Sequence, residues 1–341
     1  MQSFKISHII SETKDAKTFV LQPTDHTIPH YKAGQFVTLV FNTKFGEKRR
    51  SYSISSSPDL NESLSVTVKK VENGEFSRYL IGHKKEGDIL NSSGISGFFH
   101  LPDNMDNTDQ FFFMAAGSGI TPCYSIIKTL LTATTKNVVL IYSNRQQSDT
   151  IFYKQLQLLQ QQYPRQFQIC FLFSIHNDVY RSRLSNWLLQ HLLKTYLLTE
   201  KARALFYLCG PFDYMQMVNI TLLIEGIPSS NIRKENFNAL PRKEQPAPPD
   251  KDAHVVTIHF ENKSYQILVQ YPDTILSAAK KMRIAIPYSC EAGRCGSCAA
   301  TCIKGKIWMA YNEVLMDDEI AKGRILCCQA YPVDGEAEII V

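Results

Sequence analysis

The sequence predicts a multi-domain fold, in which an antiparallel β-barrel is followed by a doubly wound α/β domain with a parallel sheet and then by a small α+β domain. Three observations predict it. Short β-type runs fill residues 1–105, and near-continuous apolar strands alternate with helical patterns over residues 106–237. After a proline-rich stretch at 238–252, six cysteines crowd into residues 253–341. The length of 341 residues suffices for two or three such domains.

The composition excludes several classes of protein. With 44% apolar residues the chain can bury packed cores and is not disordered. No apolar run approaches the ~20 residues of a transmembrane helix, and the N-terminus MQSFKISHIISETKDAKTFV has no signal-peptide core. We therefore expect a cytoplasmic protein without membrane insertion. The net charge of +5 is too small to indicate nucleic-acid binding.

The barrel is expected over residues 1–105. Its β-type runs are FKISHII, KTFVLQ, QFVTLVF, RSYSISS and LSVTVKKV. Turn signals separate them, for example Lys32-Ala33-Gly34 and Glu72-Asn73-Gly74. One short helix, FSRYLIGH, interrupts the pattern.

The α/β domain is expected over residues 106–237. The apolar runs FFFMAA, VVLIYS, ICFLFS and LFYLCG are typical of a buried parallel sheet. After the first run, Gly117-Ser118-Gly119-Ile120-Thr121-Pro122 opens a helix. Glycines at such a turn let the backbone approach a pyrophosphate, and the helix start favours its charge. Taken alone, the motif fits an ordinary tight turn with proline in the first helical turn equally well.

A linker and a third domain complete the chain. Four prolines among charged residues predict a stiff, extended spacer at 238–252. Residues 253–341 then show strands near VVTIHF and YQILVQ and a helix at ILSAAKKM. This last domain is mildly acidic, with nine Lys and Arg against ten Asp and Glu.

The cysteines of the third domain have the spacing of a metal site. Cys290, Cys295 and Cys298 follow the pattern C-x4-C-x2-C, and 29 residues (299–327) separate Cys298 from Cys328. In a reducing compartment such a cluster indicates metal rather than disulfides. The spacing is that of plant-type [2Fe–2S] sites. A structural zinc site is the alternative, although zinc sites draw on two close pairs of Cys or His.

Two known families share these motifs. The segments IPYSCEAGRCGSCAATCIKGKI and DDEIAKGRILCCQAYPV resemble plant-type ferredoxins, which have a β-grasp fold. In that family the last ligand precedes x-Ala-Tyr-Pro, which selects Cys328 over Cys327. Residues 1–237 resemble the ferredoxin–NADP⁺ reductase family, because R-x-Y-S, G-x-x-S, G-x-G-x-x-P and C-G-P occur in that order.

The reductase resemblance implies a role for each motif residue. Tyr52 would stack on the flavin ring and Ser53 would reach flavin N5, while Cys209 would position the nicotinamide. The other residues expected to bind FAD or the nicotinamide nucleotide are Arg50, Gly74, Glu75, Phe76, Ser77, Gly117, Gly119, Thr121, Pro122, Gly210, Pro211 and Phe237. Some relatives with this domain order bind FMN in place of FAD.

The choice of nucleotide depends on the residues after VVLIY. Ser143 and Arg145 stand where NADP-preferring relatives place a hydroxyl and a cation, and Arg181 and Arg183 follow the next strand. No acidic residue occurs between VVLIY and Asp149, so the carboxylate typical of NAD sites is not evident. NADPH is favoured, with NADH as the alternative.

The domain order resembles the reductase components of multicomponent oxygenases. It implies that NADPH delivers hydride to FAD, and that electrons then pass singly through the [2Fe–2S] cluster to a partner protein. We expect a monomer with an electron-accepting protein as partner. A stand-alone reductase or diaphorase is the second hypothesis. A redox-sensing or metal-stabilised binding module is the third.

Overall fold

The computed structural model describes the chain except residues 26, 45, 176–181 and 238–245. Most of the expected linker at 238–252 and the candidate residue Arg181 thus lie outside the described residues. The chain forms two units. The first comprises Met1–Gly46, Tyr52–Ile95 and Phe99–Asn236, and the second comprises Glu47–Ser51, Ser96–Phe98 and Phe237–Val341.

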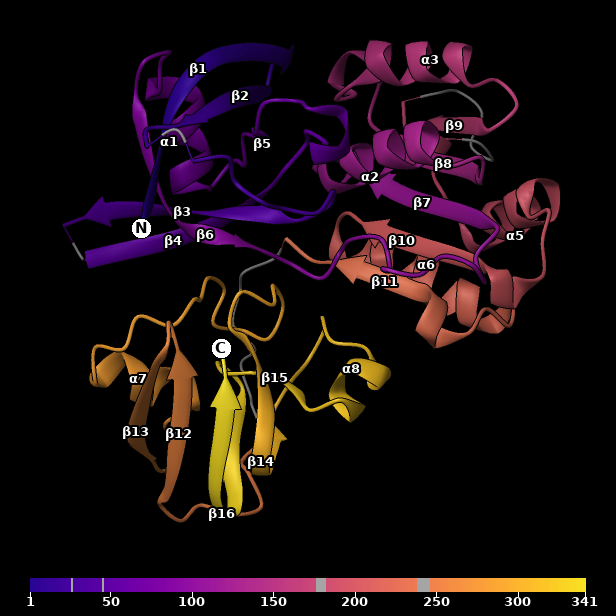
Figure 1. Cartoon of the computed structure of the whole chain (residues 1–341). Coiled ribbons are helices and arrows are strands. Elements are labelled where there is room, and N and C mark those ends of the chain that lie inside the picture. Colours follow the sequence, from indigo (N-terminus) through magenta and orange to yellow (C-terminus); the bar gives the residue numbers. More distant parts are fainter. Residues whose placement is uncertain (26, 45, 176–181, 238–245) are drawn as a thin grey trace. The chain divides into compact units, whose positions relative to one another are not determined.

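The N-terminal part of the first unit is an antiparallel, barrel-like sheet with the strand order β4-β3-β6-β1-β2-β5 (Figure 1). A bridge between Ile54 and Val66 brings the end of β4 to β5. Phe4 and Phe19 are among the apolar side chains that fill the interior, and this burial explains the β-type runs of the sequence. The elements are β1 (Gln2–Thr13), β2 (Ala16–Pro23), β3 (Phe36–Thr43), β4 (Gly46–Ser53), β5 (Ser65–Lys69), α1 (Glu75–His83) and β6 (Ile89–Ser96).

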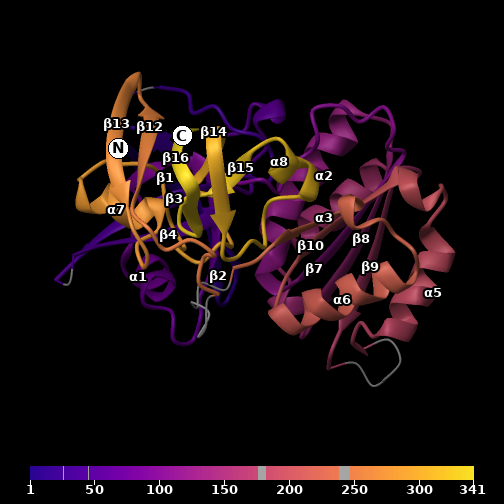
Figure 2. The same ribbon diagram turned by 90° about the horizontal axis from the view of Figure 1, so that it is seen from below.

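The C-terminal part of the first unit is a parallel sheet with the order β11-β10-β7-β8-β9. Phe111 and Phe113 pack beneath α2 and α3, whereas Phe112 and Met114 pack against α5 and α6, so both faces are covered (Figures 1 and 2). This burial on two sides explains the continuous apolar runs and confirms the doubly wound prediction. The elements are β7 (Gln110–Ala116), α2 (Ile120–Ala133), β8 (Asn137–Asn144), α3 (Tyr153–Gln162), β9 (Phe167–Phe173), α5 (Asn186–Tyr196), β10 (Ala204–Cys209), α6 (Phe212–Ile224) and β11 (Ile232–Glu235).

The second unit is an α+β domain with the sheet order β13-β12-β16-β14-β15, which confirms the predicted class. Strand β12 is antiparallel to β13 and parallel to β16. Helix α7 begins after Thr274, whose hydroxyl accepts a hydrogen bond from the Ser277 amide, and it buries Leu276 and Ala279. The elements are β12 (His254–Phe260), β13 (Lys263–Val269), α7 (Ile275–Lys281), β14 (Ala299–Met309), α8 (Asp317–Ala321), β15 (Arg324–Leu326) and β16 (Ala330–Ile340).

Asp250 anchors the beginning of this domain. Its carboxylate accepts hydrogen bonds from the amides of Asp252 (2.8 Å) and Asp334 (3.0 Å), and its Oδ2 lies 2.6 Å from Nε2 of His254. These amides, together with His254, lower the pKa of Asp250 to about 2. The chain is therefore tied to β12 and to the β16 segment from residue 250 onward.

Short 3₁₀ helices complete the fold at Pro58–Leu60, Gly117–Gly119, Gln147–Asp149, Lys201–Arg203 and Ser229–Asn231. None of the helices in the described ranges is both long and apolar enough to span a membrane.

Candidate functional site

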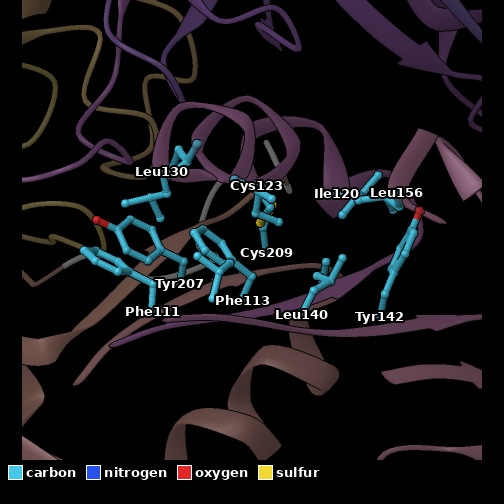
Figure 3. Packing of buried hydrophobic residues seen from close by; sticks show 14 of the residues in the cluster. Phe111, Phe113, Ile120, Cys123, Leu130, Leu140, Tyr142, Leu156, Tyr207 and Cys209 are labelled. Carbon is cyan, nitrogen blue, oxygen red and sulfur yellow. The ribbon is translucent and has the colours of Figure 1, made fainter. Parts of the chain in front are cut away.

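The carboxyl edge of the parallel sheet brings the sequence-predicted Cys209 to the glycine turn. A Cβ atom on Gly119 would lie 2.0 Å from the carbonyl oxygen of Cys209, so only glycine fits this approach. Figure 3 shows Cys209 directed from the sheet toward α2, where Cys123 lies. The ends of parallel strands at this edge are where nucleotides bind in such sheets.

Ser53 is hydrogen-bonded to the side chain of Glu235 at the same edge of the parallel sheet. Its hydroxyl donates a hydrogen bond of 3.3 Å to Oε2 of Glu235, and both residues are buried. Burial raises the pKa of Glu235 to about 8, against the smaller opposing effect of the Ser53 hydrogen bond. Glu235 therefore holds a proton at neutral pH.

The Cys209 thiol is kept neutral by the same surroundings. Burial raises its pKa, and the charge of Glu235 would raise it further. The thiolate is the nucleophilic form of cysteine. Cys209 thus suits a packing role beside a bound ring rather than a covalent one.

Glu235 was missed by sequence reasoning, although a signal existed. It ends the last strand of the parallel sheet, and the register pairs it directly with Cys209 on β10. A carboxylate at the carboxyl end of a buried strand is a candidate for function because its burial needs a partner.

The glycine turn has the features of a phosphate site. Gly117–Gly119 lead into α2, so the first amides of that helix face outward at its N-terminus. The turn is fixed by Tyr142, whose hydroxyl donates to the carbonyl of Gly117 (2.9 Å), and by Thr121, whose hydroxyl donates to that of Ser118 (2.9 Å). Pro122 lies in the first turn of the helix.

Lys69 brings a cation to this turn from the end of β5. Its Nζ would lie 3.5 Å from a Cβ atom built on Gly117. Amides and an ammonium group together suit a pyrophosphate. Lys69 is the second residue that sequence reasoning missed, since its place beside the turn depends on how the barrel strand meets the parallel sheet.

The predicted nucleotide-selecting residues lie at the end of β8. Ser143 Oγ and Asn144 Nδ2 are buried and have no hydrogen-bond partner within the described structure. Arg145 follows and is exposed, and Arg183 is exposed after β9. The side chains of Tyr214 and Tyr142 lie near enough to interact with Ser143 and Asn144, respectively.

The predicted flavin residues lie on β4 and at the start of α1. Tyr52 packs on the barrel core, and Arg50 is exposed with its Nη1 donating to the carbonyl of Arg49 (2.7 Å). Gly74 is the N-cap of α1, and Glu75, Phe76 and Ser77 form its first turn. The Ser77 hydroxyl accepts from the amide of Val71 (3.1 Å), which fixes the chain entering the helix.

Three further candidates are placed by their neighbours. A Cβ atom on Gly210 would lie 3.0 Å from that of Ala116, and Pro211 is the N-cap of α6. Phe237 is 45% exposed and is the first residue of the last segment of the second unit.

The four predicted cluster ligands come as two pairs. The Cys295 thiol lies close enough to Cys290 to lower its pKa, and the Cys328 thiol lies close enough to Cys298 to raise its pKa. Within the described residues no three His, Cys, Asp or Glu side chains gather closely enough to enclose one metal ion. Two thiol pairs are the donor set of a two-iron cluster, in which each iron takes two cysteines.

Backbone amides point at these sulfurs, as the glycine-rich loop predicts. The amide of Ala292 donates to Sγ of Cys290 (3.4 Å) and that of Cys290 to Sγ of Cys295 (3.5 Å). The Cys295 thiol and the amides of Ala292, Arg294 and Cys295 lower the pKa of Cys290 to about 6, against the opposing effect of burial. Gly293 and Gly296 have φ of +71° and +72°, which favours glycine. The loop therefore fits thiolate ligands.

Comparisons with known families match three consecutive domains. Residues 3–101 match an oxidoreductase FAD-binding domain, residues 113–219 an oxidoreductase NAD-binding domain, and residues 258–333 a 2Fe-2S iron-sulfur cluster binding domain.

Curated relatives match along almost the whole chain. One component of the 1,2-phenylacetyl-CoA epoxidase of Escherichia coli is 32% identical, with 99% of this chain and 96% of that protein covered. The ferredoxin reductase component of the 3-ketosteroid-9-alpha-monooxygenase of Rhodococcus rhodochrous is 31% identical, with 98% and 95% covered. The reductase component of the glycine betaine monooxygenase of Pseudomonas aeruginosa is 30% identical, with 95% and 91% covered.

Solved structures show the same fold. Phthalate dioxygenase reductase superposes with a TM-score of 0.61 at 24% identity over 99% of this chain and 97% of that one. An intact type IV self-sufficient cytochrome P450 monooxygenase superposes with a TM-score of 0.73 at 19% identity over 99% of this chain and 40% of that one.

Proposed function

The chain belongs to the family of oxygenase reductase components with FAD-binding, NAD-binding and [2Fe–2S] domains, and from this premise we propose that it serves an oxygenase partner with electrons taken from NADPH. It is an oxidoreductase in which electrons pass from NAD(P)H through FAD to the [2Fe–2S] cluster. The observation that carries the proposal is the match to such reductases along almost the whole chain, with all three domains in order.

Each group has residues that would hold it. Tyr52 and the start of α1 at Gly74–Ser77 would hold FAD, together with Arg50, whose planar fork suits phosphate. The turn at Gly117–Gly119 and Lys69 would hold the nucleotide pyrophosphate. When bound, these groups supply hydride transfer and one-electron transfer.

The protein's own residues position the two rings and hold one proton, on Glu235. Ser53 would orient the flavin ring and Cys209 the nicotinamide ring. Glu235, protonated at neutral pH, withholds a negative charge from the place where hydride transfer adds one. Phe237 would cover the flavin.

We propose NADPH as the preferred nucleotide because Ser143 and Arg145 stand at the end of β8, with Arg183 after β9. Replacing Arg145 by alanine is expected to lower kcat/KM for NADPH about tenfold and to leave that for NADH unchanged, since one exposed charge-assisted contact to a phosphate is lost. Steady-state rates with both nucleotides measure this. Arg165→Ala, also in the parallel-sheet domain, is the control. Equal losses with NADH and NADPH would contradict the assignment.

Domain limits, oligomeric state and location are also proposals. We place the flavin domain at 1–105, the nucleotide domain at 106–237, the linker at 238–252 and the cluster domain at 253–341. A monomer is proposed because one chain carries residues for all three groups, and sedimentation tests it. A cytoplasmic location is proposed because none of the nine cysteines, all within the described residues, forms a disulfide.

The function is tested with the purified protein. Its absorbance should show flavin and iron–sulfur bands together, and NADPH should bleach both. It should then reduce cytochrome c as a stand-in for the partner. Flavin reduction without cluster reduction would favour the diaphorase hypothesis, and the absence of bound flavin would overturn the proposal.

A further inference from the structure

Helix α2 is joined to the barrel by a buried polar contact far from its N-terminus. Lys128 on α2 is 6% exposed, and its ammonium group forms an ion pair with Glu62 from the loop between β4 and β5. The same ammonium lies 4.6 Å from the centre of the Tyr124 ring. Burial lowers the pKa of Lys128, and Glu62 opposes this. A buried lysine needs such partners.

A second contact lies beside it. The Thr129 hydroxyl donates to Oδ2 of Asp59 (3.0 Å) and lies 2.7 Å from the Ser57 hydroxyl, which must therefore donate to it. Glu62 also accepts a hydrogen bond of 2.7 Å from the amide of Ser57. The loop is thus bound to α2 and folded on itself by one set of bonds.

A third contact fixes the loop backbone. The Ser125 hydroxyl on α2 donates to the carbonyl of Ser56 (2.5 Å), and the Ser56 hydroxyl lies 2.8 Å from that of Tyr31 on the barrel. Ser125, Lys128 and Thr129 of α2, with the loop residues Ser56, Ser57, Asp59 and Glu62, are called the α2 clamp below.

The loop and the helix that these contacts join lead to the two proposed sites, the flavin site and the nicotinamide site. The loop directly continues β4, and Ser53 is three residues from Ser56. Helix α2 begins at the turn where Gly119 touches the backbone of Cys209. The clamp therefore connects the strand of the flavin site to the helix that begins at the nicotinamide site.

We propose that the α2 clamp positions the nicotinamide site against the flavin site, so that Lys128 and Thr129 are positioning residues for hydride transfer although they touch neither ring. This inference rests on the proposed function. Hydride transfer depends steeply on the distance and alignment of its two partners. A polar clamp has discrete hydrogen-bond geometry, which an apolar contact between the same elements would lack.

The test uses two variants with matched controls in the complete, cofactor-loaded protein. Thr129→Val removes the bonds to Ser57 and Asp59, and its control is Thr132→Val on the same helix, whose hydroxyl bonds only carbonyls of α2. Lys128→Met removes the buried charge, and its control is Lys154→Met, exposed on α3. Valine has the shape of threonine, so we expect Thr129→Val to fold. This variant therefore still tests the proposal if Lys128→Met does not fold.

Three quantities are measured. Stopped-flow absorbance over a series of NADPH concentrations gives the limiting rate constant of flavin reduction and the nucleotide Kd. The long-wavelength charge-transfer band reports ring contact. Amide hydrogen exchange of residues 54–64, measured without nucleotide, reports whether the loop is released.

The expected result for Thr129→Val and Lys128→Met is a rate constant lower by about tenfold or more, a weaker charge-transfer band and faster exchange in the loop, with Kd changed less than about threefold. The controls should match the parent protein. The inference is overturned if the loop is released while the rate constant and the charge-transfer band stay unchanged. If the parent protein itself shows no flavin reduction by NADPH, the proposed function has failed instead.

Discussion

Replacing Cys328 by serine is expected to reduce electron delivery to cytochrome c strongly while flavin reduction by NADPH continues. The cluster loses one of its four thiolates, and Cys298 loses the thiol to which it is paired. The rate of cytochrome c reduction should fall by about two orders of magnitude. This is more than is expected from removing a residue that only hydrogen-bonds a cluster ligand. Iron content, the iron–sulfur absorbance bands and stopped-flow flavin reduction measure the two halves of the path separately.

The adjacent cysteine provides the control for this prediction. Cys327 is fully buried, and its amide donates to the carbonyl of Cys298 (3.0 Å). Alanine retains this bond because it joins two backbone groups. Cys327→Ala should therefore keep the cluster and the cytochrome c rate. If Cys327→Ala lost the cluster and Cys328→Ser kept it, the ligand assignment would be reversed.

Replacing Glu235 by glutamine is expected to remove the alkaline limb of the pH profile of flavin reduction. The raised pKa of about 8 makes the carboxyl neutral below that pH and charged above it. In the parent protein the rate constant should fall about tenfold per pH unit above pH 8, because hydride transfer then brings negative charge toward a carboxylate. Glutamine still accepts the Ser53 hydrogen bond and cannot ionise. Its rate constant should be flat over this range.

The same residue links stability to pH, and the direction follows from the two pKa values. The carboxyl titrates near its ordinary pKa of 4.5 when unfolded and near 8 when folded, so the folded state binds more protons between these values. The free energy of unfolding should therefore fall as pH rises from about 4.5 to about 8, by up to about 5 kcal/mol. Denaturant unfolding of the Glu235→Gln variant should lack this fall.

The exposed Glu200→Gln is the control for both measurements. A parent protein whose flavin reduction is flat through pH 9 would show that the carboxyl of Glu235 does not titrate as the structure indicates.

The sequence predicts the fold from local patterns, and it proposes the cluster ligands from a local spacing. Continuous apolar runs reveal strands buried on two faces, and C-x4-C-x2-C spacing is read along one loop. The proximity of Cys290 to Cys295 and of Cys298 to Cys328 agrees with that spacing. Local sequence patterns are therefore sufficient to predict the classes of the domains.

What the sequence did not reveal depends on contacts between distant segments. Ser53 and Glu235 are 182 positions apart, and only the register of β11 against β10 brings the carboxylate to Cys209. Lys128 has the sequence context of an ordinary helical lysine. It is buried beside its ion-pair partner Glu62, which comes from the loop between β4 and β5 of the barrel. Such residues carry no local pattern, so tertiary packing alone identifies them.

The anchoring of Asp250 limits how far the two halves of the electron path can separate. Since the chain is tied to the cluster domain from that residue, only residues 237–249 remain between it and Asn236, the last residue of the first unit. A segment of this length spans at most about 45 Å even when fully extended. The covalent link makes electron transfer between the two units an intramolecular process. Internal electron transfer should then be first order and insensitive to dilution of the protein.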